Sequence, residues 1–148
     1  MTSSHPPASL RHLRERREKA ADWIRYASWT AMATAVLGAL GCLVLLFLGD
    51  RAERSWAAGL LSAYLVQGWV GYRLVPDRSQ WNAWVLMTCY GLNLVISIVR
   101  DGTYGGLLLR VLIGVVYVRG FMATIEYAEV ARAIASHAEA SPPSPGTA

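Results

Sequence analysis

Charged residues divide the chain into long apolar stretches joined by short polar connectors. Three stretches, residues 26–49, 55–72 and 79–99, carry no charge, and their lengths of 24, 18 and 21 residues approach the ~20 residues with which an α-helix crosses a bilayer core. A fourth stretch is long enough but contains Arg110 and Arg119. The pattern predicts an all-α, polytopic membrane protein, an antiparallel bundle of four transmembrane helices at residues 26–49, 55–73, 79–99 and 103–125.

The segments outside these stretches are polar. Residues 1–8 and 141–148 are rich in Ser, Pro and Ala and are predicted to be disordered. Residues 9–25 are predicted to form a basic cytoplasmic helix that leads into the first span, and residues 126–140 a helical extension on the same side. A soluble four-helix bundle is the alternative, but its exposed faces would need charges every turn or so.

Basic residues are distributed unequally between the two ends of the predicted bundle. Of the 14 Lys and Arg residues, nine fall on the side of the termini, three on the opposite side and two within the fourth span. The positive-inside rule therefore places both termini in the cytoplasm. Aromatic residues mark the same boundaries, as interfacial belts do: on the cytoplasmic side Trp23, Tyr26, Trp69, Tyr72, Trp81, Trp84 and Tyr127, and on the outer side Trp56 and Tyr104.

Each predicted span carries a stripe of small or polar residues at helical spacing. We expect the stripes to face the bundle interior, because helices in lipid are held together by close backbone approach and interhelical hydrogen bonds. The stripes are Ala27, Ala31, Thr34, Gly38 and Gly41 in the first span, Tyr64, Gln67 and Gly71 in the second, Tyr90, Asn93 and Ser97 in the third, and Thr103, Gly106, Arg110, Tyr117, Gly120 and Thr124 in the fourth.

Arg110 lies on the polar stripe of the fourth span, roughly 9–12 Å from its outer end at 1.5 Å per residue. The short connector before this span sets a register that brings Asn93 opposite Arg110, which predicts a hydrogen bond, directly or through water. No Asp or Glu lies within any span, so Arg110, Asn93 and Tyr90 form the candidate intramembrane polar site. Three roles stay open for it: a structural polar cluster, a site for an anionic ligand or lipid, and a contact with a partner subunit's carboxylate.

Arg119 differs from Arg110 in its position around the helix. The two residues are nine positions apart, which places them about 180° from each other on an ideal helix. Arg119 therefore lies on the apolar side, and we expect its stem to stay in lipid while its head reaches water at the cytoplasmic interface. A subunit contact and a role in binding a solute are the alternatives.

The sequence contains no catalytic or metal-binding constellation. The spans hold no Asp, Glu or His, Cys42 and Cys89 are not part of a CxxC pair, and no Gly-rich phosphate loop is present. We therefore expect no enzymatic activity, no cofactor and no metal. The segment 11–19 has five Lys or Arg against two Glu and suits an anionic membrane surface. Nucleic acid is not an expected partner.

The segment YVRGFMATIEYAEVARA, residues 117–133, passes through Arg-Gly into a Thr-x-x-Tyr sequence. With the preceding hairpin, it resembles small uncharacterised bacterial four-span membrane proteins over the C-terminal half. The resemblance implies a bacterial inner-membrane location and carries no activity.

The function that these observations favour is an interaction or accessory component, either self-associated as a homo-oligomer or part of a larger membrane complex. The alternative is a small oligomeric carrier or channel in which Arg110 selects an anionic solute. A dry, filled bundle favours the first, and a polar cavity lined by Arg110, Asn93 and Tyr90 favours the second.

Overall fold

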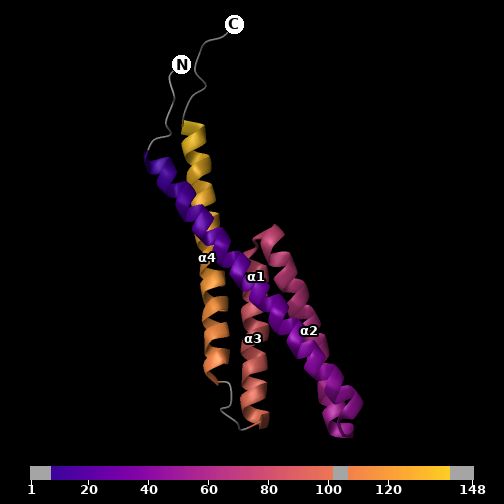
Figure 1. Ribbon diagram of the computed structural model, residues 1–148. Helices are drawn as coiled ribbons and strands as arrows, with labels where there is room; N and C mark the ends of the chain where they lie inside the picture. The colour runs from indigo at the N-terminus through magenta and orange to yellow at the C-terminus, as the bar shows by residue number, and fades with distance from the viewer. Residues whose placement is uncertain (1–7, 102–106, 141–148) are drawn as a thin grey trace.

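The computed structural model describes the backbone of residues 8–101 and 107–140, and the side chains of residues 10–96 and 108–137 (Figure 1). This part of the chain is entirely helical and contains no strand. Its four helices are α1 (Ala8–Leu48), α2 (Arg51–Asp77), α3 (Gln80–Asp101) and α4 (Leu107–Ala140). The predicted disordered tails, apart from Ala8, and the expected start of the fourth span at Thr103 lie outside the described residues.

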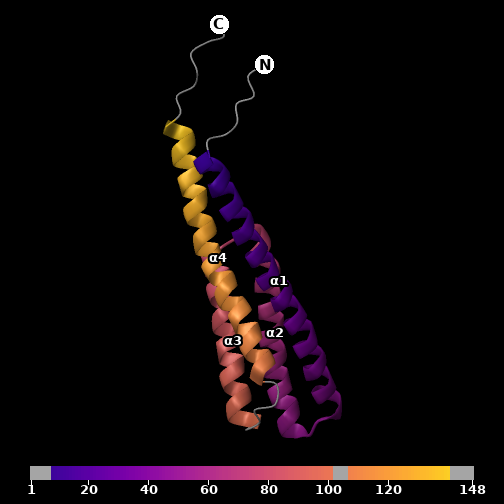
Figure 2. The same ribbon diagram turned by 60° about the vertical axis from the view of Figure 1, so that its left-hand side comes forward.

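Consecutive helices run in opposite directions, and each packs against two others (Figures 1 and 2). α1 packs against α2 and α4, and α3 packs against the same two helices. The start of α1 and the end of α4 lie together at one end of the bundle, the terminal end, while the α1–α2 connector lies at the opposite, far end (Figure 1). The all-helical, four-helix prediction is therefore confirmed.

The α1–α2 connector is shorter than predicted, because α2 begins at Arg51 and not after Arg54. Asp50 caps the helix: its carboxylate accepts the backbone N–H of Glu53 at 2.8 Å, and the Glu53 carboxylate accepts the backbone N–H of Asp50 at 3.0 Å. This reciprocal capping box satisfies free N–H groups of the first turn. The helix can therefore start directly after Asp50.

The α2–α3 connector is also shorter than predicted. The predicted span ends at residue 73, whereas α2 continues through Pro76 to Asp77. A proline in the last turn removes only one helical hydrogen bond. The helix ends at Arg78, which has a left-handed conformation with φ of 45° and donates its backbone N–H to the Leu74 carbonyl at 3.0 Å.

At the terminal end, α1 and α4 extend past the α2–α3 connector and pair with each other (Figure 1). Arg16 forms an ion pair with Glu126 at 2.8 Å, and Arg17 donates to the Tyr127 hydroxyl at 2.7 Å. The basic segment that precedes the first predicted span belongs to the single continuous helix α1. The two extensions are thus a packed pair of helices.

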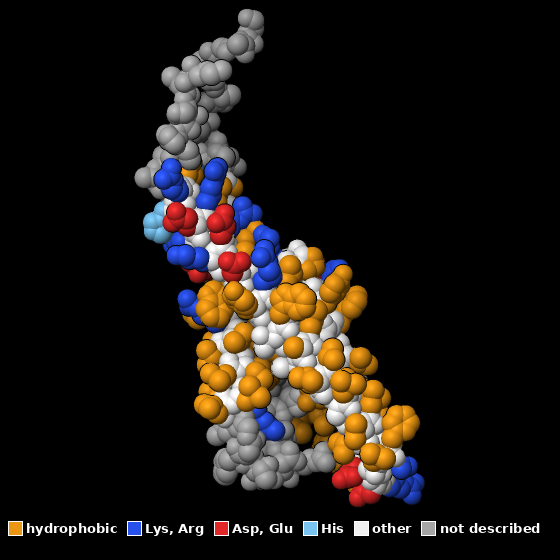
Figure 3. Space-filling view, in the orientation of Figure 1, with side chains coloured by type: hydrophobic (Ala, Val, Ile, Leu, Met, Phe, Trp, Pro, Cys, Tyr) orange, Lys and Arg blue, Asp and Glu red, His pale blue; other side chains and the backbone are white. Residues whose placement is uncertain are grey.

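Apolar side chains cover the outside of the bundle between two charged ends (Figure 3). Large exposed residues include Leu37 at 70%, Phe47 at 78% and Leu108 at 75% of their full exposure. α1 and α4 are long and apolar enough to cross a membrane, over Leu10–Leu48 and Leu108–His137. An exposed apolar surface of this extent marks an interface with lipid or protein.

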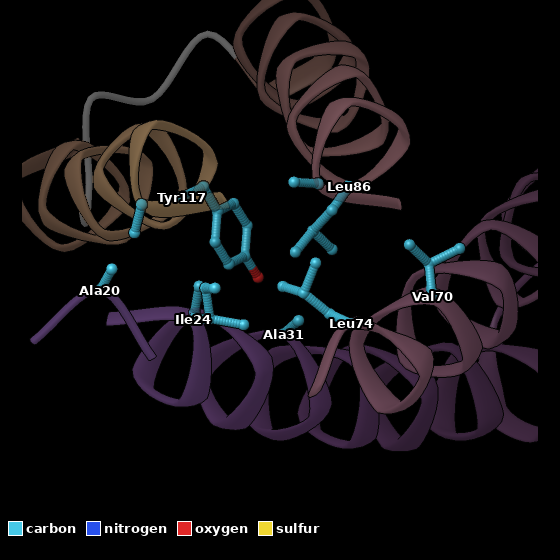
Figure 4. Close-up of a cluster of buried hydrophobic side chains, with 10 residues drawn as sticks. Ala20, Ile24, Ala31, Val70, Leu74, Leu86 and Tyr117 are labelled. Atoms are coloured by element: carbon cyan, nitrogen blue, oxygen red, sulfur yellow. The ribbon is translucent and has the colours of Figure 1, made fainter. Parts of the chain in front are cut away.

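The main cluster of buried side chains lies where all four helices meet (Figure 4). Small residues permit this packing: a Cβ on Gly71 would lie 2.7 Å from the Ala31 Cβ, and a Cβ on Gly120 would overlap Ala27. The main cluster consists of Ala20, Ile24, Ala27, Ala31, Val70, Leu74, Ala83, Leu86, Tyr117 and Ala123, which come from all four helices.

One member of the predicted interior stripes faces outward. Gly41 is exposed, and a Cβ added to it would have no neighbouring atom within 4 Å, whereas Cys42 beside it is buried at 4% exposure. Two straight helices cross at an angle, so a given face of one helix stays in contact with the other over a limited length only. At Gly41 the stripe has turned out of the helix–helix interface.

Candidate functional site

A cavity of about 430 Å³ lies between the four helices on the far side of the core. All four helices supply polar residues to its lining: Thr34, Tyr64, Gln67, Tyr90, Asn93 and Arg110. The α1–α2 hairpin leans away from the α3–α4 hairpin at this end (Figure 1), and the surface is hollowed between them (Figure 3). The bundle is therefore filled toward the terminal end, and the cavity lies on the far side of this packed part.

The rest of the lining is apolar. Besides Gly38, it consists of Leu37, Leu94, Leu109 and Ile113. The sequence pattern did not assign these leucines and the isoleucine to the site, although Ile113 lies three residues after Arg110 and so on the same face of α4. The cavity thus combines one guanidinium, several neutral polar groups and hydrocarbon.

A hydrogen-bonded network closes the cavity toward the core. The Tyr117 hydroxyl, on a side chain only 2% exposed, lies 2.9 Å from the Thr34 hydroxyl. Gln67 donates from Nε2 to Thr34 at 2.7 Å and to Tyr117 at 3.1 Å. The network joins α1, α2 and α4 and satisfies polar groups that are costly to bury alone. We call this network the floor of the cavity, and the packed core lies on its other side.

Tyr90 connects this floor to Arg110. Its ring meets the Tyr117 ring edge to face, with centroids 4.9 Å apart at 89°, and its hydroxyl donates to the Arg110 backbone carbonyl. A Cβ on Gly114 would lie 3.3 Å from the Tyr90 ring, so Gly114 leaves room for this approach. Tyr90 therefore fixes the backbone of α4 at the level of Arg110.

The guanidinium of Arg110 is half-buried in the cavity wall and, among the described side chains, has no ion pair or hydrogen bond. Asn93 lines the same cavity, but no direct hydrogen bond joins it to Arg110 within the described residues. The direct form of the expected bond is therefore absent within the described residues, and its water-mediated form stays a prediction. The three predicted site residues nevertheless face one cavity.

Arg110 is the one charged residue in the lining that the described side chains form, and this lining contains no Asp or Glu. Its guanidinium makes the wall of the cavity electropositive. The arrangement can hold a negatively charged group.

Arg119 lies away from this cavity. Its guanidinium stands over the Trp23 ring, 5.6 Å from the centroid, beside a second cavity that also contacts Lys19 and Glu126. Trp23 is one of the aromatic residues that predict the cytoplasmic boundary. The side chain of Arg119 is thus directed toward the charged terminal end, the direction expected for an arginine that extends to water.

The described residues contain no group of three or more His, Cys, Asp or Glu side chains that could hold a metal ion, and Cys42 and Cys89 are free thiols. No protein-family model, no curated protein and no solved structure matches the chain. The function is therefore inferred from the geometry alone.

Proposed function

We propose that this protein is a four-span inner-membrane protein that binds an anionic solute in the cavity at Arg110 and acts as a small carrier. The observation that supports this most strongly is the shared cavity of Arg110, Asn93 and Tyr90, about 430 Å³ in volume, to which the described side chains contribute no carboxylate. An intramembrane arginine without an acidic partner is costly, and such residues mark ligand pathways.

The lining suggests which anion the cavity takes. A single guanidinium matches one carboxylate or sulfonate, which it can bind through two parallel hydrogen bonds. Leu37, Leu94, Leu109 and Ile113 match an apolar body, and Asn93 and Gln67 can orient polar substituents. We therefore propose a monovalent organic anion as the solute class.

The asymmetry of the bundle fits one state of a carrier. The Thr34–Gln67–Tyr117 network closes the cavity toward the terminal end, and the surface is hollowed between the two hairpins (Figure 3). Alternating access requires such a closed side, which opens when helix pairs rock against each other. The α1–α2 and α3–α4 hairpins are the proposed moving units.

The proposed orientation has both termini in the cytoplasm, with all four helices crossing the membrane. It is supported by the excess of basic residues at the terminal end and by charged groups at both ends of the apolar surface (Figure 3). The cavity then lies on the outer side of the packed core.

An accessory role in a membrane complex is the second candidate. Its support is the guanidinium of Arg110, which has no carboxylate partner among the described residues. A carboxylate from a partner subunit would neutralise it. In that case, the cavity is a docking site for a side chain and not for a solute.

Uptake by vesicles separates the two roles. Benzenesulfonate is a suitable probe because its sulfonate stays ionised and crosses pure lipid slowly. Vesicles containing the purified protein should take it up faster than empty vesicles, Arg110→Leu should abolish the difference, and Arg119→Leu should retain it. Extraction of the protein from its native membrane with a mild detergent is the complementary experiment. If a stoichiometric partner protein is extracted with it and the purified chain shows no uptake, the accessory role is supported and the carrier role is contradicted.

A further inference from the structure

A second basic site lies at the terminal end, where three parts of the chain converge. A cavity of about 430 Å³ is lined there by Arg14, Arg17 and Arg25 of α1, Arg78 of the α2–α3 connector and Tyr127 of α4, together with Glu18 and Ala21. We name this the arginine pocket. It is separate from the cavity at Arg110 and is not needed for the carrier proposal.

Tyr127 is the centre of the arginine pocket. Its hydroxyl accepts hydrogen bonds from Nε and Nη2 of Arg17 at 3.0 and 2.7 Å. The guanidinium of Arg78 lies over its ring, 4.4 Å from the centroid, and that of Arg17 lies 5.0 Å from it. One half-buried tyrosine thus holds two guanidinium groups from different elements in place.

The charge of the arginine pocket is not balanced by the described residues. Four arginines face one glutamate, Glu18, and their only ion pair within the described chain joins Arg25 to Asp22, exposed and 3.5 Å long. Arg14, Arg17 and Arg78 have no carboxylate within 4.0 Å in this part of the chain. Guanidinium groups gathered in this way repel one another, and an anion between them removes the repulsion.

The backbone at Arg78 is unusual for a residue other than glycine. Its φ of 45° is the only positive value at a non-glycine residue in the described chain. Glycine is the usual residue at this helix-ending position because it adopts the left-handed conformation without steric cost. An arginine here has a conformational cost, and it presents its guanidinium to Tyr127.

The pocket lies at the level where exposed aromatic residues surround the bundle. Trp23 and Tyr26 flank Arg25 on α1, and Trp81 stacks on Trp84 just after Arg78. Exposed Trp and Tyr side chains favour the headgroup region of a bilayer. We propose that the arginine pocket binds the phosphate of an anionic phospholipid in the leaflet at the terminal end, a proposal that rests on the proposed membrane placement but not on any role of Arg110.

The test is the thermal unfolding of the purified full-length protein in neutral detergent, with added phosphatidylglycerol, phosphatidylcholine or inorganic phosphate. Phosphatidylglycerol should raise the midpoint most. The variant Arg17→Gln/Arg78→Gln should weaken its apparent affinity roughly thirtyfold, since each basic residue near a membrane surface contributes about a factor of five. Arg73→Gln, which removes a charge that is paired with Asp77 outside the pocket, should keep the wild-type response.

If the variant Arg17→Gln/Arg78→Gln does not fold, Arg78→Gly provides a second test of the arginine pocket. Glycine relieves the left-handed backbone, so this variant should fold at least as well as the wild type while losing selectivity for phosphatidylglycerol. Equal losses in Arg73→Gln and Arg78→Gly would show a diffuse basic surface and overturn the site. A response to inorganic phosphate as large as that to phosphatidylglycerol would overturn the lipid assignment.

Discussion

Gly120 of α4 lies directly against Ala27 of α1, so closely that a Cβ on Gly120 would overlap the Ala27 Cβ. Ala27 is 1% exposed and belongs to the main buried cluster. Close contact at small residues is the main source of helix association in lipid. This contact therefore holds α1 and α4 at the spacing that the Tyr117 network needs.

Gly120→Ala should destabilise the bundle by about 1–3 kcal/mol, the usual cost of adding a group to a filled interface. Gly91→Ala is the matched control, because a Cβ there has no neighbour within 4 Å. Thermal unfolding of both variants in the same detergent measures the difference. An unchanged midpoint for Gly120→Ala would mean that α1 and α4 are further apart than described.

Tyr117→Phe removes a hydroxyl that contacts both Thr34 and Gln67. It should cost about 1 kcal/mol, since interhelical hydrogen bonds in membranes contribute modestly. Gln67 keeps its bond to Thr34, so the floor is weakened but not lost. Tyr72→Phe, on a side chain 60% exposed, should have no effect on the midpoint. Equal stability of the two variants would contradict the network.

Gly38→Ala tests the shape of the cavity without changing its charge. A Cβ on Gly38 would overlap the Tyr64 ring, so the ring must move, and both residues line the cavity. We expect weaker binding of benzenesulfonate with Arg110 unchanged. Gly41→Ala, on the same helix but with no neighbour within 4 Å, should bind like the wild type. Wild-type affinity in Gly38→Ala would place the anion elsewhere.

Single cysteines test the proposed orientation. In a background of Cys42→Ala and Cys89→Ala, Ala52→Cys at the far end should react with a membrane-impermeant maleimide on intact cells. Ser136→Cys at the terminal end should react only after the membrane is permeabilised. The reverse pattern would invert the topology, and labelling of both on intact cells would contradict four crossings.

Much of the fold follows from the position of charges and small residues. Gaps between charges predicted four helices, and the small residues Ala27, Ala31, Gly71 and Gly120 occupy the interior as expected. Helix ends were less predictable. The capping box of Asp50 and Glu53 and the left-handed conformation of Arg78 depend on local hydrogen bonds. A hydropathy pattern does not reveal such bonds.

The sequence predicted which residues belong to the site but not how they are arranged in space. Arg110, Asn93 and Tyr90 share a cavity because they follow the polar stripes of adjacent helices. The splay between the α1–α2 and α3–α4 hairpins, beside which the cavity lies, arises from helix crossing angles that a stripe of residues does not specify. Tyr127 was interpreted only as a boundary marker, since its contacts with Arg17 and Arg78 join residues far apart in the sequence.

Arg110 is proposed as the anion-binding group of the cavity, and a binding titration tests this role most directly. Benzenesulfonate should be titrated into the purified protein by calorimetry, with Arg110→Leu and Arg119→Leu as a pair that each removes one guanidinium from α4. A charge-assisted hydrogen bond contributes about 1.5–3 kcal/mol, so Arg110→Leu should weaken binding roughly tenfold to a hundredfold, and Arg119→Leu should leave it unchanged. Equal affinities for the wild type and Arg110→Leu would contradict this role.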